Sequence, residues 1–293
     1  MPNRSGTVAI VGRPNVGKST LLNAAVGQRV AITSPKPQTT RDRILGVCNL
    51  PHGQIAFVDT PGVHHPRNAL GVHMVRQARE ALEGVDALVL MVEPTDHPDD
   101  RRALDLVRGS GLPTILAINK IDSTRDKMGL LPLIAFWQPL HDFAHIIPLS
   151  ARTGDGVRPF LECLRDLLPE AESPYPEDAL TDRTERFLAA ELVREQIFLQ
   201  TSKEVPYASA VTIERFEDRK GGDSVIEAIV HVERPSQRKI LVGEGGARIR
   251  EIGTRARLTI SEALSRPVHL KLWVEVDADW SRDDESLRRM GYG

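Results

Sequence analysis

The chain has 293 residues, 41% hydrophobic and 27% charged, which is long enough for one large domain or two ordinary ones. Its formal net charge of -2 indicates no general attraction to polyanions, so any basic surface must be local. Cys48 and Cys163 lie outside any CxxC or Cys/His spacing, which argues against disulfides and zinc and favours a reducing cytoplasm. No stretch approaches the roughly 18 apolar residues that span a bilayer, so we expect neither export nor membrane insertion.

Five short apolar runs alternate with segments of helical spacing between Thr7 and Leu168. This alternation predicts an α/β domain with a mostly parallel sheet and helices on both faces. The expected strands cover residues 7–11, 54–59, 86–93, 113–119 and 145–150. A further strand over 43–50 is expected to pair with 54–59 as an antiparallel hairpin across the sequence PHG.

The stretch from 169 to 180 is rich in proline and acid and has no apolar periodicity, which indicates a linker. We therefore expect a first domain over residues 1–170, a linker over 171–181 and a second domain over 182–293. The second domain is predicted to contain, in order, a helix, two strands joined by a turn at Gly221 and Gly222, two helices and a strand. These elements cover residues 182–200, 207–218, 223–234, 238–242, 247–264 and 268–276.

Directly after the first strand, GRPNVGKS matches the phosphate-loop motif GxxxxGK[ST] and runs into helical sequence. Glycines let the backbone turn its N–H groups towards phosphate oxygens, and the helix amino terminus adds positive potential. Lys18 is expected to reach the outer phosphates and Ser19 to ligate Mg2+. A glycine-rich turn without a ligand is the alternative, which the full motif in this context disfavours. The predicted nucleotide contacts in this loop are Gly12, Arg13, Pro14, Asn15, Val16, Gly17, Lys18, Ser19 and Thr20.

The sequence DTPG follows the strand 54–59, at the edge of the sheet where α/β proteins place ligands. Asp59 is expected to bind Mg2+ through water, and the N–H of Gly62 to bond the terminal phosphate. Alone, DTPG is an ordinary turn sequence, so this interpretation depends on its place after the phosphate loop. Thr60, Pro61 and Val63 are predicted as further nucleotide contacts.

The sequence NKID ends the strand 113–119 and indicates which base is bound. The carboxylate of Asp122 can accept hydrogen bonds from the guanine N1–H and 2-amino group, which adenine lacks, so GTP is favoured over ATP. Asn119 is expected to brace the loop, Lys120 to cover the base, and the N–H of Ala151 to bond the guanine oxygen. An isolated NKID would instead be interpreted as a helix cap. The predicted set is completed by Ile121 and Ser150.

The linear order of these motifs resembles Ras-like GTP-binding domains over residues 7 to 168. The resemblance implies a first switch in SPKPQTTRDR, with a threonine that ligates Mg2+ only when GTP is bound. Thr40 matches this position, and Thr39 is the alternative. We therefore predict catalytic roles for Lys18, Thr40, Asp59 and Gly62, and Mg2+ ligation by Ser19, Thr40 and Asp59.

Val63 stands where many GTPases carry the glutamine that orients the attacking water, so water positioning must come from elsewhere. His64 and His65 are candidates, although adjacent histidines in a loop are more often solvated. Asn15 resembles GTPases in which potassium supplies the missing positive charge, so K+ is a hypothetical second cofactor. Intrinsic hydrolysis is expected to be slow, because neither the glutamine nor an arginine finger is evident.

The sequence GEGG lies between two predicted helices and resembles the GXXG loop with which KH domains grip a nucleic-acid backbone. From 235 to 272, eight Lys and Arg residues stand against three Glu, a local positive excess that the average conceals. A helix cap beside a solvated charged face is the alternative, which the type II KH order of helices and strands disfavours. The predicted RNA contacts are Arg238, Lys239, Ile240, Val242, Gly243, Glu244, Gly245, Gly246, Arg248, Ile249 and Arg250, and Ile252 is expected to wall the base groove.

Over essentially its full length the chain resembles the Era family of bacterial GTPases, through the motifs above and the segment VPYASAVTIERFED. The expected fold is an α/β P-loop GTPase domain followed by an α+β type II KH domain. The resemblance implies GTP hydrolysis to GDP with Mg2+, binding to the 3′ end of small-subunit (16S) ribosomal RNA, and a role in maturation of the 30S subunit.

The resemblance also implies peripheral association with the inner face of the cell membrane, although we find no amphipathic or lipidated anchor. We expect a cytoplasmic monomer in which GTP orders Thr40 and the DTPG loop and leaves the GEGG groove open to RNA. The alternative is a GTPase that acts at a membrane or on a protein partner and binds RNA independently of nucleotide.

Overall fold

The computed structural model describes the chain except for residues 1, 63–67, 96, 125–126 and 293. The chain forms two compact units, of which the first comprises Met1–Ala31, Thr40–His65 and Met74–Asp182. The second comprises Ile32–Thr39, Pro66–His73 and Arg183–Gly293. Two short segments from the first half of the sequence thus group with the second unit. The predicted division into two domains joined by one linker placed both segments in the first domain. Every helix in the described part of the chain is too short or too polar to cross a lipid bilayer.

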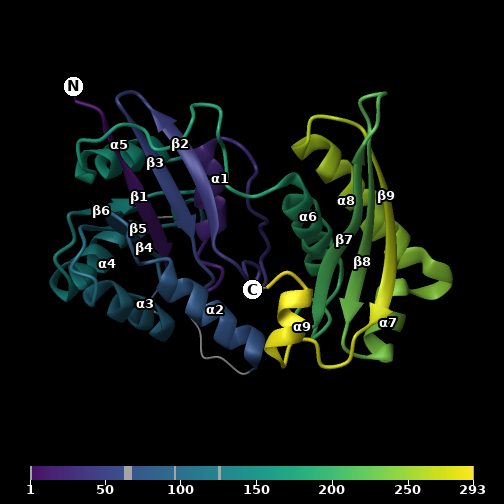
Figure 1. The fold of residues 1–293 in the computed structure, drawn as a ribbon. Helices are drawn as coiled ribbons and strands as arrows, with labels where there is room; N and C mark the ends of the chain where they lie inside the picture. Colours follow the sequence, from purple (N-terminus) through teal and green to yellow (C-terminus); the bar gives the residue numbers. More distant parts are fainter. Residues whose placement is uncertain (1, 63–67, 96, 125–126, 293) are drawn as a thin grey trace. The chain divides into compact units, whose positions relative to one another are not determined.

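A six-stranded sheet forms the centre of the first unit, in the order β2-β3-β1-β4-β5-β6 (Figure 1). The strands are β1 (Arg4–Val11), β2 (Ile44–Leu50), β3 (Gly53–Asp59), β4 (Ala87–Val92), β5 (Thr114–Ile118) and β6 (His145–Pro148). Neighbouring strands pair in parallel, except that β2 and β3 form an antiparallel hairpin. The predicted mostly parallel sheet with an antiparallel edge strand is confirmed.

Helices pack on this sheet and explain why two of its strands, β4 and β5, are buried along their whole length. Both β4 and β5 are buried at every position. Helices α3 (Pro98–Arg108) and α4 (Leu130–Trp137) contribute Leu104, Val107 and Trp137 to a core shared with β1, β4 and β5. The remaining helices with residues in this unit are α1 (Lys18–Val26), α2 (Ala69–Glu80) and α5 (Val157–Leu167).

The segment that we predicted as a linker is hydrogen-bonded to the first unit. The N–H of Ser5 donates to the carbonyl of Pro169 at 3.2 Å, and the N–H of Val47 donates to the carbonyl of Leu180 at 2.9 Å. These bonds satisfy backbone groups of β1 and β2, which lie in the sheet. The segment therefore belongs with the first unit as far as Asp182.

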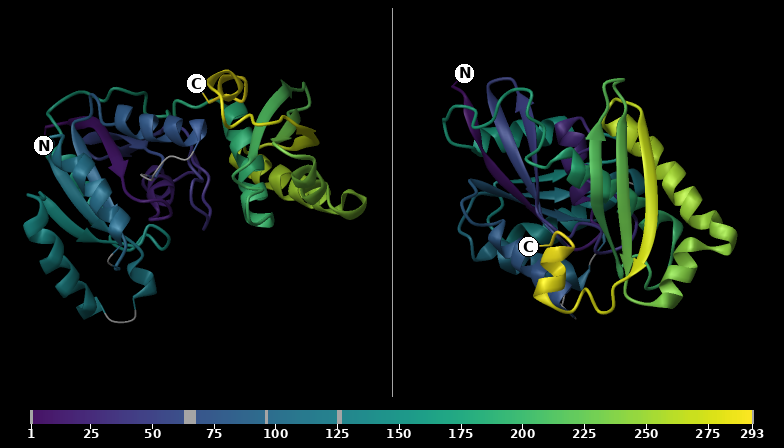
Figure 2. Two further views of the ribbon diagram at one scale, coloured as in Figure 1. Left: turned by 90° about the horizontal axis from the view of Figure 1, so that it is seen from below. Right: turned by 45° about the vertical axis from the view of Figure 1, so that its right-hand side comes forward.

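The second unit contains a three-stranded sheet in the order β7-β8-β9, with helices on one face of it (Figure 2). The elements from residue 183 onwards are α6 (Glu185–Gln200), β7 (Ser209–Asp218), β8 (Ser224–Val232), α7 (Pro235–Val242), α8 (Ala247–Ala263), β9 (Val268–Val276) and α9 (Asp284–Arg289). Strands β7 and β8 are antiparallel, with Gly222 at φ 82° in their turn, whereas β8 and β9 are parallel. The predicted order of helices and strands is confirmed.

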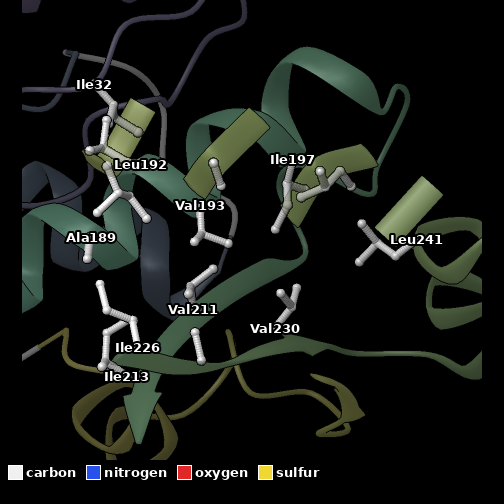
Figure 3. Close-up of a cluster of buried hydrophobic side chains, with 14 of the residues drawn as sticks. Ile32, Ala189, Leu192, Val193, Ile197, Val211, Ile213, Ile226, Val230 and Leu241 are labelled. Atoms are coloured by element: carbon white, nitrogen blue, oxygen red, sulfur yellow. The ribbon is translucent and has the colours of Figure 1, made fainter. Parts of the chain in front are cut away.

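One apolar core joins these helices to the sheet. Figure 3 shows Leu192 and Ile197 of α6 above Val211 of β7 and Val230 of β8, all of them buried. Ile32 lies in the same core and is 1% exposed, although it comes from the segment after α1. A side chain of the first half of the sequence is therefore part of the second unit's core.

The core also corrects one expectation about the RNA groove. Ile252 is 0% exposed and packs in the core with Ala256 and Ile260, so it does not wall a groove. These three residues are spaced by four along α8, and the helical period places them on the face that meets the sheet.

The two cysteines differ in exposure, which yields a testable difference in reactivity. Cys48 in β2 is 4% exposed, and burial raises the pKa of its thiol to about 11, whereas Cys163 on α5 is partly exposed. Because the thiolate is the reactive form, we expect iodoacetamide at roughly pH 8 to alkylate Cys163 and to spare Cys48 in the native protein. Peptide mass spectrometry before and after unfolding in urea measures this, and rapid native labelling of Cys48 contradicts it.

Candidate functional site

The loop between β1 and α1 has the backbone of an anion site. Asn15 and Gly17 adopt positive φ angles of 65° and 106°. Gly17 precedes α1, and no side chain caps the helix. The first N–H groups of a helix have no partner within the helix, so an uncapped amino terminus offers them to an anion.

Lys18 begins α1 and its side chain is buried, 6% exposed. Its ammonium donates to the carbonyl oxygens of Gly12 at 3.0 Å and Arg13 at 3.1 Å. Burial lowers the pKa of Lys18 to about 8, and the charge of Asp59 opposes this shift. A phosphate group beside the loop would favour the charged form of the lysine further.

Three oxygen-bearing side chains meet at the carboxyl end of β3. The hydroxyl of Ser19 donates to Asp59 Oδ2 at 2.6 Å and lies 2.8 Å from the hydroxyl of Thr40. Thr40 Oγ1 is 3.4 Å from the same carboxylate oxygen. Thr39 differs, because its hydroxyl donates to the carbonyl of Lys36 at 2.8 Å. Of the two adjacent threonines, Thr40 is thus the one that faces the predicted metal ligands.

The environment of Asp59 suits a divalent cation. Its side chain is fully buried, and burial raises its pKa while the charge of Lys18 opposes the shift. Its second oxygen, Oδ1, has no hydrogen-bond partner among the residues that the structure describes. A buried carboxylate needs compensating charge, and Mg2+ prefers oxygen ligands, so Ser19, Thr40 and Asp59 fit this ion.

The DTPG turn packs directly on the phosphate loop. The hydroxyl of Thr60 donates to the carbonyl of Ile10 at 2.8 Å. A Cβ at Gly62 would lie 2.7 Å from the Cα of Pro14, so only glycine fits without a shift of the backbone. Pro61 lies between Thr60 and Gly62 in the turn. Val63, His64 and His65 lie outside the described residues.

Asn119 ties the NKID loop to the phosphate loop. Its side-chain amide donates to the carbonyl of Val16 at 2.8 Å and accepts the N–H of Ala151 at 2.9 Å. Lys120 adds a bond from its ammonium to the carbonyl of Asn15 at 2.7 Å. The structure therefore brings the predicted phosphate and guanine residues together in one site.

Asp122 lies at the outer end of this site. It accepts a hydrogen bond from the Ser150 hydroxyl at 2.6 Å and another from the guanidinium of Arg152. The Ser150 bond, with help from the Arg152 charge, holds the pKa of Asp122 below its ordinary value, so the carboxylate stays ionised. Ile121 is buried beside it at 5% exposure. Thr20, in the first turn of α1, completes the predicted nucleotide set.

Sequence reasoning missed three charged residues here, namely Arg152, Glu93 and Asp100. Arg152 contacts the predicted guanine-binding carboxylate, while Glu93 and Asp100 both form ion pairs with Arg13. Glu93 had a usable signal, because it directly follows β4, at the carboxyl end where parallel sheets place functional groups. Asp100 lies within α3, and no motif marks it.

The loop between α7 and α8 has the backbone that the GXXG pattern predicts. Gly243, Gly245 and Gly246 have positive φ angles of 72°, 55° and 77°. A Cβ at Gly245 or Gly246 would meet nothing within 4 Å, and Glu244 between the glycines is exposed. The loop therefore presents bare backbone to solvent, as close approach to a nucleic-acid backbone requires.

The predicted RNA contacts around this loop are mostly exposed. The cations Arg238, Lys239, Arg248 and Arg250 all have exposed side chains, while Val242 and Ile249 are partly buried. Ile240 is 39% exposed, and its carbonyl accepts a hydrogen bond from Arg248 at 2.9 Å. Cations beside an exposed apolar side chain form a surface that suits phosphates and bases together.

The segment before Thr40 is held within the second unit. The carbonyl of Thr39 accepts a hydrogen bond from the guanidinium of Arg194, which is 1% exposed and also bonds Glu191 at 2.7 Å. Lys36 donates to the carbonyls of Phe198 and Thr201 at the end of α6. Buried, charge-assisted bonds therefore fix residues next to the predicted switch threonine.

Comparisons with known proteins match both parts of the chain to described families. A family described as 50S ribosome-binding GTPase matches residues 7–120, and one described as KH domain matches residues 204–281. A GTPase Era of Geobacter metallireducens is 46% identical over 99% of this chain and 98% of its own length. A GTPase Era of Xylella fastidiosa is 46% identical over 100% of this chain and 98% of its own length.

Two solved structures match the fold at a TM-score of 0.95, with 41% identity over 99% of both chains. One is a variant of Aquifex aeolicus Era bound to GDP.AlF4-. The other is Era in complex with MgGDPNP and nucleotides 1506-1542 of 16S ribosomal RNA.

The phosphate loop, the DTPG and NKID turns, and the helix and strand order after residue 183 define a P-loop GTPase joined to a KH domain. The identity to curated relatives extends over nearly the whole length of the chain. The chain belongs to the Era family of GTPases. The roles of the individual site residues stay predictions.

The contact between Gly17 and Asn119 allows a test of the site geometry. A Cβ at Gly17 would lie 2.3 Å from Asn119 Nδ2, on a backbone at φ 106°. We expect Gly17→Ala to lower the free energy of unfolding by about 3 kcal/mol, through backbone strain and the displaced amide. Gly27→Ala is the matched control, because Gly27 has φ 76° with nothing within 4 Å, and we expect a loss of about 1 kcal/mol. Urea unfolding measures both, and equal losses contradict the proposed packing of Asn119.

Proposed function

We propose that this protein is a GTP-hydrolysing switch that binds the 3′ end of small-subunit ribosomal RNA and assists maturation of the 30S subunit. One observation carries the proposal: the chain passes from the second unit to the first between Thr39 and Thr40. Thr40 touches the predicted Mg2+ ligands, whereas Thr39 is bonded to Arg194 in the unit that carries the GEGG loop. The related complex of Era with MgGDPNP and 16S RNA nucleotides supports both ligands.

The nucleotide would lie with its phosphates at the phosphate loop and its guanine at Asp122. Ser19, Thr40 and Asp59 would hold Mg2+, which supplies positive charge to the phosphates when bound. Lys18 adds a second positive charge, and the uncapped amino terminus of α1 adds N–H donors. With these charges and donors already in place, the site stabilises charge that develops as the terminal phosphate leaves.

The switch follows from where the predicted ligands sit in the chain. A terminal phosphate that draws Thr40 towards Mg2+ pulls on Thr39. It thereby pulls on a segment that is bonded to Arg194 and, through Lys36, to the carbonyls of Phe198 and Thr201. Hydrolysis removes that phosphate and releases the pull. Linkage requires the reverse effect too, so RNA bound at the GEGG loop would change the affinity for GTP.

The setting of this activity is also a proposal. Cys48 and Cys163 are both free thiols, which fits the reducing cytoplasm in which ribosomal subunits are assembled. We expect a monomer there, and peripheral membrane association remains an implication of family resemblance. A GTPase acting on a membrane is the competing function, and binding to anionic liposomes at moderate salt distinguishes it.

RNA-dependent hydrolysis tests the switch. We expect an oligonucleotide copying the 3′ end of 16S RNA to raise the rate of GTP hydrolysis, and Gly245→Asp to abolish that increase. The new carboxylate would face RNA phosphates from an open position and weaken binding by about tenfold or more. Phosphate release measures the rate, and filter binding with GTP, GDP and no nucleotide measures the affinity.

Gly222→Asp is the matched control, because Gly222 also has positive φ, at 82°, with nothing within 4 Å of its Cβ, but lies in the β7–β8 turn. It should retain the RNA response. RNA affinity that is identical in all three nucleotide states would leave two independent binding domains and remove the coupling.

The dependence of GTP hydrolysis on potassium tests whether K+ supplies the positive charge that an arginine finger provides in other GTPases. We propose that Asn15, at φ 65° in the phosphate loop, helps to hold K+, so hydrolysis should be about tenfold faster in KCl than in NaCl. Asn15→Gly removes the amide while tolerating the backbone conformation, and should erase the difference between the salts. Equal rates of the unaltered protein in both salts would remove the basis for this role.

A further inference from the structure

Glu93 is a carboxylate that two cations of the nucleotide site share. It directly follows β4 and is 18% exposed. Its Oε2 lies 2.8 Å from a guanidinium nitrogen of Arg13 in the phosphate loop, and its Oε1 lies 2.5 Å from the ammonium of Lys120 in the NKID loop. No part of the predicted phosphate, metal or base chemistry accounts for this residue.

A second carboxylate completes the arrangement around Arg13. Asp100 on α3 is 1% exposed, and its Oδ1 lies 3.2 Å from Arg13 Nε. Burial raises the pKa of Asp100 to about 6, and the neighbouring Arg13 charge opposes that shift. Arg13 therefore lies between two carboxylates, and its positive charge contributes to the lowered pKa of Lys18.

The Lys120 side of the arrangement fixes backbone as well as charge. The Lys120 ammonium donates both to Glu93 and to the carbonyl of Asn15 at 2.7 Å. Asn15 and Lys120 themselves have left-handed backbones, with φ of 65° and 66°. Such conformations persist only where surrounding contacts determine them, and Glu93 provides such a contact to the residue that holds Asn15.

These contacts make Glu93 a third connection between the two loops, beside the bonds of Asn119 and Lys120. An ion pair with a cation that is 40% exposed adds little to the free energy of unfolding. The ion pairs of Glu93 instead fix the position of the phosphate loop relative to the NKID loop. In the proposed site these loops would hold opposite ends of one nucleotide. Separation of the loops would break contacts at both ends.

We infer that Glu93 is a positioning residue that keeps Arg13 and Lys120, and with them the two loops, in one arrangement and thereby slows release of guanine nucleotide. The inference rests on the proposed nucleotide site. It assigns no contact between Glu93 and the nucleotide. Its effect is therefore expected on nucleotide release and KM more than on the hydrolytic step.

Glu93→Gln tests this, because glutamine keeps the size of the side chain and removes its charge. We expect fluorescent N-methylanthraniloyl-GDP to dissociate about tenfold faster, since neutral hydrogen bonds replace charge-assisted ones. KM for GTP should rise by a similar factor, while kcat at saturating GTP changes by less than about twofold. Stopped-flow fluorescence with excess unlabelled GDP measures dissociation, and steady-state kinetics separates KM from kcat.

Two further variants make the result decisive. Glu83→Gln removes the same charge from an exposed position after α2 and should release nucleotide like the unaltered protein. Glu93→Asp keeps the charge, but its side chain is too short to reach both cations at once. Nucleotide should therefore dissociate from it at a rate between those of the unaltered protein and Glu93→Gln. If Glu93→Gln does not fold, Glu93→Asp carries the test.

Release at the unaltered rate from both Glu93 variants overturns the inference. A lower thermal midpoint of the nucleotide-free variant with kcat and KM changed together also overturns it, because that outcome indicates a structural role. Absence of guanine-nucleotide binding by the unaltered protein would instead contradict the proposed function.

Discussion

The side-chain amide of Asn119 is the contact on which the nucleotide site depends. It is 2% exposed and joins loops after β1, β5 and β6 through its bonds to Val16 and Ala151. Removing one partner of a buried hydrogen bond costs about 1–3 kcal/mol, so the three loops are held as a set. This amide therefore helps to fix the distance between Lys18, the predicted phosphate ligand, and Asp122, the predicted guanine ligand.

The second constraint comes from the path of the chain. Segments 32–39 and 66–73 belong to the second unit, and each continues directly into the first. The later segment is held by the carboxyl-terminal residues, since the N–H of Leu70 donates to the carbonyl of Ser281 at 3.1 Å and His73 packs edge-on against Tyr292. Thr40 in the predicted first switch therefore directly follows chain that belongs to the second unit. In the proposed switch, a nucleotide signal would need no separate relay, because Thr40 and the anchored Thr39 are covalent neighbours.

Apolar runs and glycine motifs were sufficient to predict the sheet and the order of elements, because each is a local pattern in the sequence. The ion pairs of Glu93 and Asp100 could not be predicted in this way, since their partner Arg13 is 80 or more residues away in sequence and meets them only after the sheet assembles. The choice between Thr39 and Thr40 also needed the structure, because the two residues are identical in the sequence and differ only in where their hydroxyl groups point. Ile252 was misplaced for the same reason, as only packing shows which face of α8 is buried.

The cations of the second unit divide into two sets that respond differently to salt. Arg238, Lys239 and Arg248 are exposed around the GEGG loop. Added salt would therefore weaken the attraction between these predicted RNA contacts and phosphates. Arg194 is buried and paired with Glu191, so salt screens it far less. Ionic strength therefore separates the two parts of the proposed switch. In the proposed switch, high salt would weaken RNA binding and would leave intact the bond that holds the segment beside Thr40.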